Sequence, residues 1–130
     1  MKGMVSVKEL VAPGGNLIIA SECAEGMGSE EFVEAQKRLI KLGPEKFMES
    51  ILKCSKAEID EWGTQCIIKA VSKCNIQLYT TGLSEEEKTL TGVSIIEDMQ
   101  KAVLESVKQT GCDQVLIIPE GPYVVPKLKG

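Results

Sequence analysis

The predicted fold follows from one stretch, Pro13 to Ser29, which reads PGGNLIIASECAEGMGS. Its first three residues are a strong turn signal, and Leu17 to Ala20 form a continuous apolar run, typical of a strand that is covered on both faces. Gly26 and Gly28 interrupt the loop that follows, and Ser29 can cap the next helix. We therefore expect a buried strand, a loop and a helix, and ligands of open α/β sheets usually bind at such a strand-to-helix edge.

Two further apolar runs complete the predicted sheet. Ile76 to Thr80 is rich in β-branched and aromatic residues, and Val115 to Ile118 is ended by a proline-rich turn. The segments between the strands have helical periodicity, and three of them carry a capping box, namely Ser55-x-x-Glu58, Ser84-x-x-Glu87 and Ser94-x-x-Glu97. The alternation predicts the α/β class in three layers, with a small, mostly parallel sheet of about three main strands and helices on both faces, like half of a Rossmann fold.

The composition limits the classes of protein that this chain can belong to. A length of 130 residues without an internal repeat or linker predicts a single domain over residues 1–130. The net charge of -4 leaves no basic stripe, so we expect no nucleic-acid partner. No apolar run approaches the roughly 20 residues that span a bilayer, and the first ten residues lack the apolar centre of a signal peptide. These features predict a cytoplasmic protein without a membrane partner.

Cysteine and histidine usage restricts the chemistry further. The 5 cysteines form no Cys-x-x-Cys pair, which argues against a disulfide framework and against a zinc site. The absence of histidine removes the commonest metal ligand and the commonest general acid or base. We therefore predict no metal site and no catalytic residue in this chain by itself.

Several short motifs occur in order along nearly the whole chain: Lys2-Gly3-Met4, the Pro-Gly-Gly-x-Leu-Ile-Ile strand, Ser-Glu-Cys-x-x-Gly-x-Gly-Ser, Trp62-x-x-Gln65 and the closing Ile-Ile-Pro-Glu-Gly. Together they resemble the C-terminal domain of the nickel-dependent lactate racemase family. The resemblance implies complete proteins that interconvert the two enantiomers of a 2-hydroxy acid by reversible hydride transfer from the substrate carbon. It also implies that the complete enzyme uses a nickel pincer nucleotide as its cofactor.

The resemblance implies a partner for this chain, because it covers only the C-terminal domain. In the family, the lysine that tethers the cofactor and the histidines that bind nickel and move the hydroxyl proton belong to the N-terminal domain. We therefore expect this chain alone to bind no cofactor, and to work with an N-terminal racemase-like domain of the same longer protein or of a separate subunit. A homo-oligomer is left open.

The first predicted substrate-binding residues come from the resemblance. Lys2 matches a lysine that meets the substrate carboxylate in the family, although the Tyr-Gln pair that precedes that lysine is missing here. Trp62 matches a tryptophan that lies close to the cofactor and the substrate in the family. Gln65 follows three residues later, so both side chains can point into one cleft from the same helix face. The alternative for Trp62 is a core residue of an amphipathic helix.

The other predicted substrate-binding residues lie at strand ends, and they are Glu22, Gly26, Gly28, Ser29, Glu120 and Gly121. Loop amides at a helix start can cradle an anion, although one Gly-x-Gly pair is more typical of a plain turn, and Glu22 and Glu25 would repel a phosphate unless they face away. If all three strands are parallel, Glu120 ends the last strand on the same edge as the glycine loop. Its carboxylate can bind a substrate hydroxyl or cap a neighbouring turn.

Two functions from different classes remain open after the sequence analysis. The first is the C-terminal, substrate-cleft domain of a lactate-racemase-like 2-hydroxy-acid racemase or epimerase, inactive alone because the cofactor-binding half is missing. The second is a stand-alone α/β module that binds a ligand or a protein without catalysis. A domain completed by a partner should expose an apolar cleft wall near Trp62, whereas a finished module should have that wall covered.

Overall fold

The computed structural model describes residues 2–127 and places three parallel strands in one sheet. The strands are β1 (Asn16–Ala20), β2 (Asn75–Tyr79) and β3 (Ser94–Ile96), and they lie in the order β1-β2-β3. Leu17 of β1 lies opposite Ile76 of β2, and Gln77 of β2 lies opposite Ser94 of β3. The predicted strand after the Pro-Gly-Gly turn and the predicted second strand are thus confirmed to within one residue at each end.

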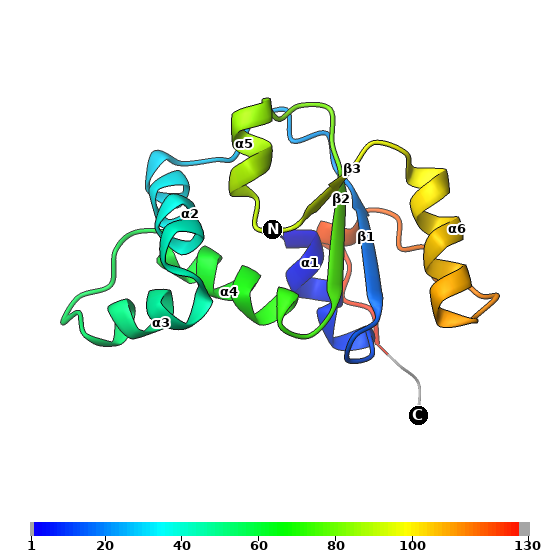
Figure 1. Cartoon of the computed structure of the whole chain (residues 1–130), viewed down its shortest axis with the longest axis horizontal. Helices are drawn as coiled ribbons and strands as arrows, with labels where there is room; N and C mark the ends of the chain where they lie inside the picture. The colour runs from blue at the N-terminus through cyan, green and yellow to red at the C-terminus, as the bar shows by residue number, and fades with distance from the viewer. Residues whose placement is uncertain (1, 128–130) are drawn as a thin grey trace.

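Helices cover both faces of this sheet, which confirms the predicted three-layer α/β class (Figure 1). On one face lies α6 (Met99–Thr110), and on the other lie α1 (Lys2–Val7) and α4 (Glu61–Val71). The remaining helices are α2 (Glu30–Leu42), α3 (Pro44–Leu52) and α5 (Glu85–Leu90), with short 3-10 turns η1 (Lys8–Leu10) and η2 (Gly121–Tyr123). Across residues 2–127, every helix is too short or too polar to cross a bilayer.

The main core lies between the sheet and the two helices α1 and α4. Its buried residues are Met4, Ile67, Ala70, Cys74 and Ile76, and Leu17, Ile19 and Phe32 pack against them. The helix periodicity places Ile67 and Ala70 on one face of α4, as three residues separate them, and Cys74 follows the end of that helix. This core fixes the two helices that border the pocket described below.

The third strand differs from the predicted one. Val115 to Ile118 forms no strand, and Val115, Leu116 and Ile117 are 52%, 74% and 79% exposed. The third strand of the sheet is instead β3, a segment whose sequence predicted a capping box at Ser94. The capping box is wrong because the backbone at Ser94 pairs with β2, and the side chain of Asp98 caps α6 by accepting from the amide of Lys101 at 2.9 Å.

The helix expected after the capping box at Ser55 also starts later than predicted. The predicted box at Ser55 and Glu58 does not begin a helix, because α4 starts only at Glu61, after Asp60 in the left-handed region (φ 61). The Glu61 carboxylate accepts instead from the backbone amide of Glu58 at 3.1 Å and pairs with Arg38 of α2. These tertiary contacts hold the segment before α4 as a loop.

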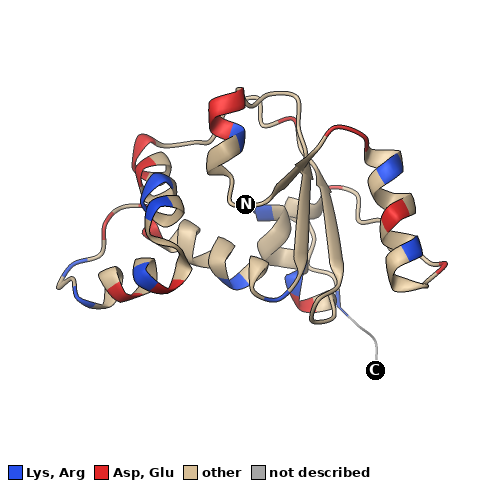
Figure 2. Ribbon diagram, in the orientation of Figure 1, with Lys and Arg blue, Asp and Glu red and all other residues tan. Residues whose placement is uncertain are grey.

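The two other predicted caps are confirmed. The Ser29 hydroxyl accepts from the amide of Phe32 at 3.1 Å at the start of α2. Ser84 and Glu87 form a complete capping box at the start of α5, with the Ser84 amide donating to Glu87 Oε2 at 2.8 Å. Acidic side chains also lie in the first turns of α2 and α5 (Figure 2). There they complement the positive end of each helix dipole.

Candidate functional site

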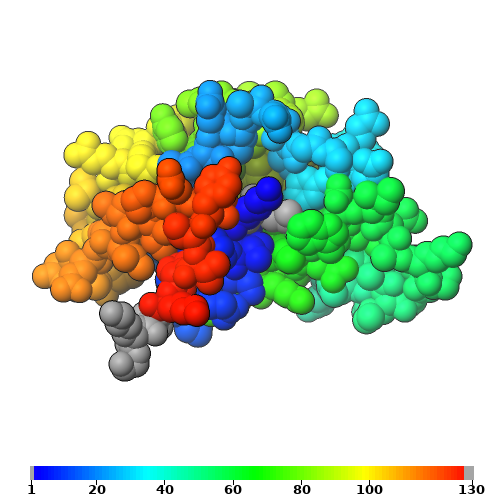
Figure 3. Space-filling view, turned by 180° about the vertical axis from the view of Figure 1, so that it is seen from behind, coloured from blue at the N-terminus to red at the C-terminus, as the bar shows by residue number. Residues whose placement is uncertain are grey.

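A pocket with a volume of about 280 Å³ lies at the carboxyl-end side of β1 and β2. The loop after β1, the start of α4, one face of α2 and α1 surround it, and the dark blue, light blue, cyan and green segments adjoin one another on the face shown in Figure 3. Large apolar side chains form much of its wall, namely Met4, Met27, Phe32, Trp62, Ile67, Leu78, Leu83 and Val93. A concave, mostly apolar pocket at strand ends is the usual form of a small-molecule site.

Four of the predicted site residues line this pocket. They are Gly26, Gly28 and Ser29 of the loop after β1, and Trp62 at the start of α4. The Trp62 side chain is not a core residue, because it is 60% exposed. The structure thus brings together the glycine loop and the tryptophan, which are separated by more than thirty residues in the sequence.

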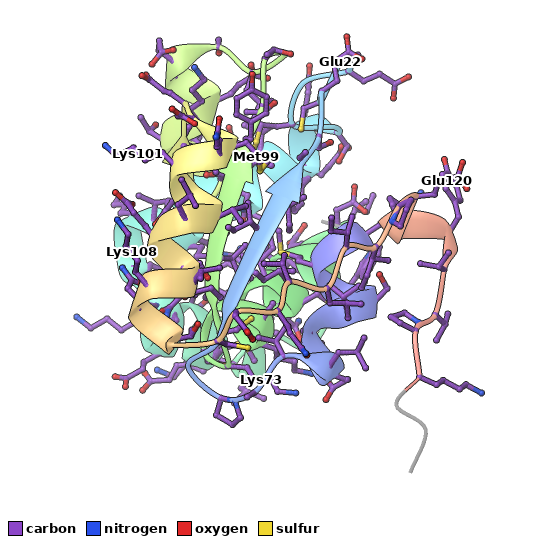
Figure 4. All side chains as sticks on the ribbon, turned by 90° about the vertical axis from the view of Figure 1, so that its right-hand side faces the viewer. Glu22, Lys73, Met99, Lys101, Lys108 and Glu120 are labelled. Carbon is purple, nitrogen blue, oxygen red and sulfur yellow. The ribbon has the colours of Figure 1, made fainter. Side chains whose placement is uncertain are left out.

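The other predicted residues do not line the pocket. Lys2 is exposed on α1, two residues before the pocket residue Met4, and Gln65 is half-buried on α4. Glu22 is exposed above the end of β1, whereas Glu120 lies beyond α1 (Figure 4). The expected shared edge for Glu120 and Gly121 is wrong, because no strand leads into them: the Gly121 carbonyl accepts from Ser6 of α1 at 3.1 Å instead.

The glycine loop is anchored to α5 by one carboxylate. Glu87 Oε1 accepts from the backbone amide of Met27 at 3.2 Å, while Glu87 Oε2 accepts from Ser84. The hydrogen bonds from Ser84, and then the one from Met27, lower the pKa of Glu87 below its ordinary value. A Cβ atom at Gly26, where φ is 66°, would lie 2.6 Å from Glu87 Oε1, so this approach of loop and carboxylate requires glycine.

A second anchor joins the loop to α4. The Ser29 hydroxyl donates to Asp60 Oδ2 at 2.5 Å. Asp60 precedes α4 in the left-handed conformation and makes no capping hydrogen bond to that helix. It is also the one charged side chain among the pocket-lining residues in the described part of the chain. A non-glycine residue in this conformation costs of order 1–3 kcal/mol and often occurs at ligand sites.

The start of α4 is held in place from its other side by α2. Arg38 pairs with Glu61, whose side chain is only 4% exposed, and the Arg38 guanidinium lies over the ring of Phe47 at 4.8 Å from its centroid. Trp62 follows Glu61 directly, so its backbone is fixed although its ring is exposed. An exposed indole on a fixed backbone can pack against a ligand or a partner with little loss of conformational entropy.

Sequence reasoning missed Gln36 and Asp60 at this pocket. Gln36 is fully buried on the apolar stripe of α2, where its Nε2 donates to the Leu90 carbonyl at 3.0 Å. Its Oε1 has no hydrogen-bond partner within residues 2–127. A glutamine four residues after Phe32 and three before Leu39 was the available signal, because a polar residue on an apolar stripe is unusual. For Asp60 the sequence offered no distinguishing pattern.

The fold and the pocket define a small α/β domain with a ligand-sized apolar pocket at the carboxyl ends of parallel strands. Residues 1–125 match the family described as Lactate racemase C-terminal domain. This chain belongs to that family, and the resemblance found in its motifs is confirmed.

One relative has both a sequence and a structural match. The chain is 26% identical over 133 residues to the lactate racemase of Thermoanaerobacterium thermosaccharolyticum, which covers 99% of this chain and 30% of the racemase. The structure of the lactate racemase apoprotein from the same organism superposes with a TM-score of 0.76 at 26% identity, covering 95% of this chain and 30% of that one. This chain therefore spans 30% of the length of that racemase.

The donor groups of this chain do not fit a resident nickel site. The sequence has no histidine, and residues 2–127 contain no group of three or more cysteine, aspartate or glutamate side chains placed to hold a metal ion. Imidazole is a usual nickel ligand in proteins. The described residues can therefore shape a pocket but cannot by themselves ligate the metal that the family implies.

Proposed function

We propose that this chain forms the C-terminal, substrate-facing domain of a lactate-racemase-like racemase or epimerase of 2-hydroxy acids, and that it is inactive without an N-terminal racemase-like domain. That domain belongs either to the same longer protein or to a separate subunit. The observation that carries the proposal is the pocket, which joins the glycine loop and Trp62 in a chain that spans 30% of the related racemase.

The residues of this chain would bind and orient the substrate rather than react with it. Lys2 is exposed on α1, two residues before the pocket residue Met4, and in this proposal its ammonium pairs with a substrate carboxylate. Trp62 would cover the substrate from the start of α4, with Gln65 one helical turn further on. The glycine loop would shape the opposite wall. In this proposal the nickel pincer nucleotide and the acid–base groups are supplied by the N-terminal domain.

The exposure of Trp62 supports this proposal over a stand-alone module. A finished module would cover its large apolar groups, but the indole is 60% exposed beside an open apolar pocket. Exposed apolar surface next to a pocket is typical of an interaction site. A partner domain that closes over Trp62 would remove water from the bound substrate and strengthen its ionic contacts.

The test begins with the native gene product. An immunoblot with an antibody against this chain should show a band several times heavier than 14.1 kDa. If the band lies near 14.1 kDa instead, purification with the same antibody should recover a second subunit. That assembled protein should interconvert d- and l-lactate or a related 2-hydroxy acid, measured by chiral chromatography, and the isolated chain should not.

Substitutions then test the proposed roles in the assembled protein. Trp62→Ala and Lys2→Met should each lower kcat/KM by about tenfold or more, the scale of a lost substrate contact. Leu104→Ala on α6, a residue that is 53% exposed and outside the pocket, is the matched control and should leave the rate unchanged. A band near 14.1 kDa without a partner and without enantiomer interconversion would favour the stand-alone module.

A further inference from the structure

We infer that this pocket receives the group carried on C2 of the 2-hydroxy acid, and that it selects bulky apolar groups over the methyl group of lactate and over acidic groups. The inference rests on the proposed function and adds the class of substrate to it. It derives from the size, the lining and the hydrogen bonding of the pocket.

The size of the pocket argues against a methyl group as its best occupant. Its volume is about 280 Å³. A methyl group is about as large as a water molecule, whose share of the liquid volume is roughly 30 Å³, so it would leave most of this space empty. In this open pocket the apolar side chains around a methyl group would stay in contact with water, whereas a branched or aromatic group would cover them.

The lining of the pocket favours an apolar occupant. Met4 of α1, Phe32 of α2 and Ile67 of α4 face it from the helices, and Leu78, Leu83 and Val93 face it from β2 and the segments around α5. All but Phe32 and Val93 in this set are at least 92% buried. An apolar group that enters this pocket leaves water and meets well-packed hydrocarbon on several sides, which is favourable in proportion to the area buried.

The charges around the pocket disfavour an acidic occupant. The one charged residue of the lining is Asp60, a carboxylate, and among residues 2–127 no lysine or arginine lines the pocket. A second substrate carboxylate placed here would be removed from water without a cation to pair with it. Burial of an unpaired charge is costly, so dicarboxylic 2-hydroxy acids are disfavoured.

Three side-chain donors of the pocket wall, those of Gln36, Thr91 and Ser29, are already used within the protein. The Gln36 amide donates to the Leu90 carbonyl at 3.0 Å, and the Thr91 hydroxyl donates to the Lys88 carbonyl at 2.9 Å. Ser29 likewise donates to Asp60. An anionic group in the pocket would therefore receive one of these hydrogen bonds only if a hydrogen bond within the protein were broken. An apolar group requires no hydrogen bond.

Binding to the isolated chain tests the inference directly. Trp62 is the only tryptophan of the sequence and lines the pocket, so its fluorescence reports binding there. Three acids with the same carboxylate and hydroxyl are compared: 2-hydroxy-4-methylpentanoate, lactate and malate. The branched acid should bind about tenfold or more tightly than lactate, since each buried methylene contributes a factor of that order. Malate should bind no more tightly than lactate.

A pocket-filling variant separates selectivity from general damage. Val93→Phe should reduce the affinity for the branched acid at least tenfold while the affinity for lactate stays within about twofold, because the added ring occupies the space of the larger group. Leu104→Phe on α6, outside the pocket, is the control and should keep the preference of the wild type. A variant that was merely misfolded would lose both ligands together.

Each other outcome contradicts the inference. Lactate or malate binding as tightly as the branched acid, a preference that survives in Val93→Phe, or no binding of any of the three acids would each overturn it. The proposed function is decided separately by enantiomer interconversion in the assembled protein. An assembly that racemises lactate while the isolated chain prefers lactate overturns the pocket inference alone.

Discussion

Replacement of Gly82 by alanine should disrupt the hydrogen bonds that join the loop after β1 to the segment after β2. The Gly82 amide donates to the Glu22 carbonyl at 2.8 Å, and the Thr80 hydroxyl donates to the same oxygen at 3.0 Å. A Cβ atom at Gly82 would lie 2.3 Å from the Glu22 oxygen and 2.7 Å from the Cys23 oxygen. Both neighbours are backbone atoms, so the loop itself has to move.

The expected cost follows from that movement. Overpacking typically costs about 1–3 kcal/mol, and each weakened backbone hydrogen bond adds about 1 kcal/mol. The sum is a loss of about 2–4 kcal/mol in the free energy of unfolding, which corresponds to roughly 10 °C in Tm for a domain of this size. The binding of 2-hydroxy acids at the pocket should weaken in parallel, because Gly26 to Ser29 belong to the displaced loop.

Thermal unfolding followed by circular dichroism measures this prediction, with Gly3→Ala as the control. A Cβ atom at Gly3, within α1, meets nothing within 4 Å. Because alanine is the better helix former, this control should be unchanged or gain about 0.5–1 kcal/mol. The reasoning would be refuted if Gly82→Ala unfolded within about 2 °C of the wild type, a shift well below that of a lost backbone contact.

Two further predictions concern carboxylates that hold the pocket. The pKa of Glu87 is lowered from 4.5 by the hydrogen bonds from Ser84 and then by the one from Met27, so its stabilising contribution is complete above pH 4.5 and is lost as the pH falls through the lower pKa of the folded state. In thermal melts, Glu87→Gln should show a weaker acid dependence than the wild type, and equal slopes would contradict the stabilising role of these hydrogen bonds. Arg38→Met leaves Glu61 buried without its partner and should lower the free energy of unfolding in urea by about 2–4 kcal/mol. The control Lys37→Met breaks an exposed pair and should lower it by less than about 1 kcal/mol. Similar losses in both variants would contradict the stabilising role of the buried pair.

The strand and helix that follow the Pro-Gly-Gly turn could be predicted because their signals are local. The apolar run from Leu17 to Ala20 has the length of a strand, and the Ser29 cap needs only its own hydroxyl and the amide three residues later. The second strand was predictable for the same reason. In both cases the structure adds one residue at the start, Asn16 or Asn75, whose side chains hydrogen-bond to each other at 3.1 Å.

The capping boxes show where local signals fail. Ser55, Ser84 and Ser94 each precede a glutamate by three residues, but only the box at Ser84 forms. The segment at Ser94 pairs with β2, and the loop after Ser55 is fixed by the buried pair of Arg38 and Glu61. Both competing contacts involve residues far away in the sequence, so a capping pattern alone could not reveal them.

The site was partly predictable for a similar reason. Four predicted site residues line the pocket, namely Gly26, Gly28, Ser29 and Trp62. Their residue types suggest a role at a site even when their neighbours in the fold are unknown. Asp60 is informative only through its hydrogen bond to Ser29, 31 residues away in the sequence. The role of Gln36 depends on the Leu90 carbonyl, 54 residues away. Asp60 was missed because only the tertiary structure supplies its environment, whereas the place of Gln36 on the apolar stripe of α2 was a sequence signal that was not used.

The same contacts explain why the ligand pocket is apolar although its loop has the form of an anion cradle. At the loop, the Met27 amide already donates to the carboxylate of Glu87, and at the start of α2 the Phe32 amide already donates to Ser29. The anion at this loop is therefore a carboxylate of the protein itself. An external phosphate would have to displace Glu87 and break the capping box of α5. Under the proposed function, an apolar group would enter beside the loop without disturbing either contact, and the loop would shape the pocket rather than bind the ligand's charge.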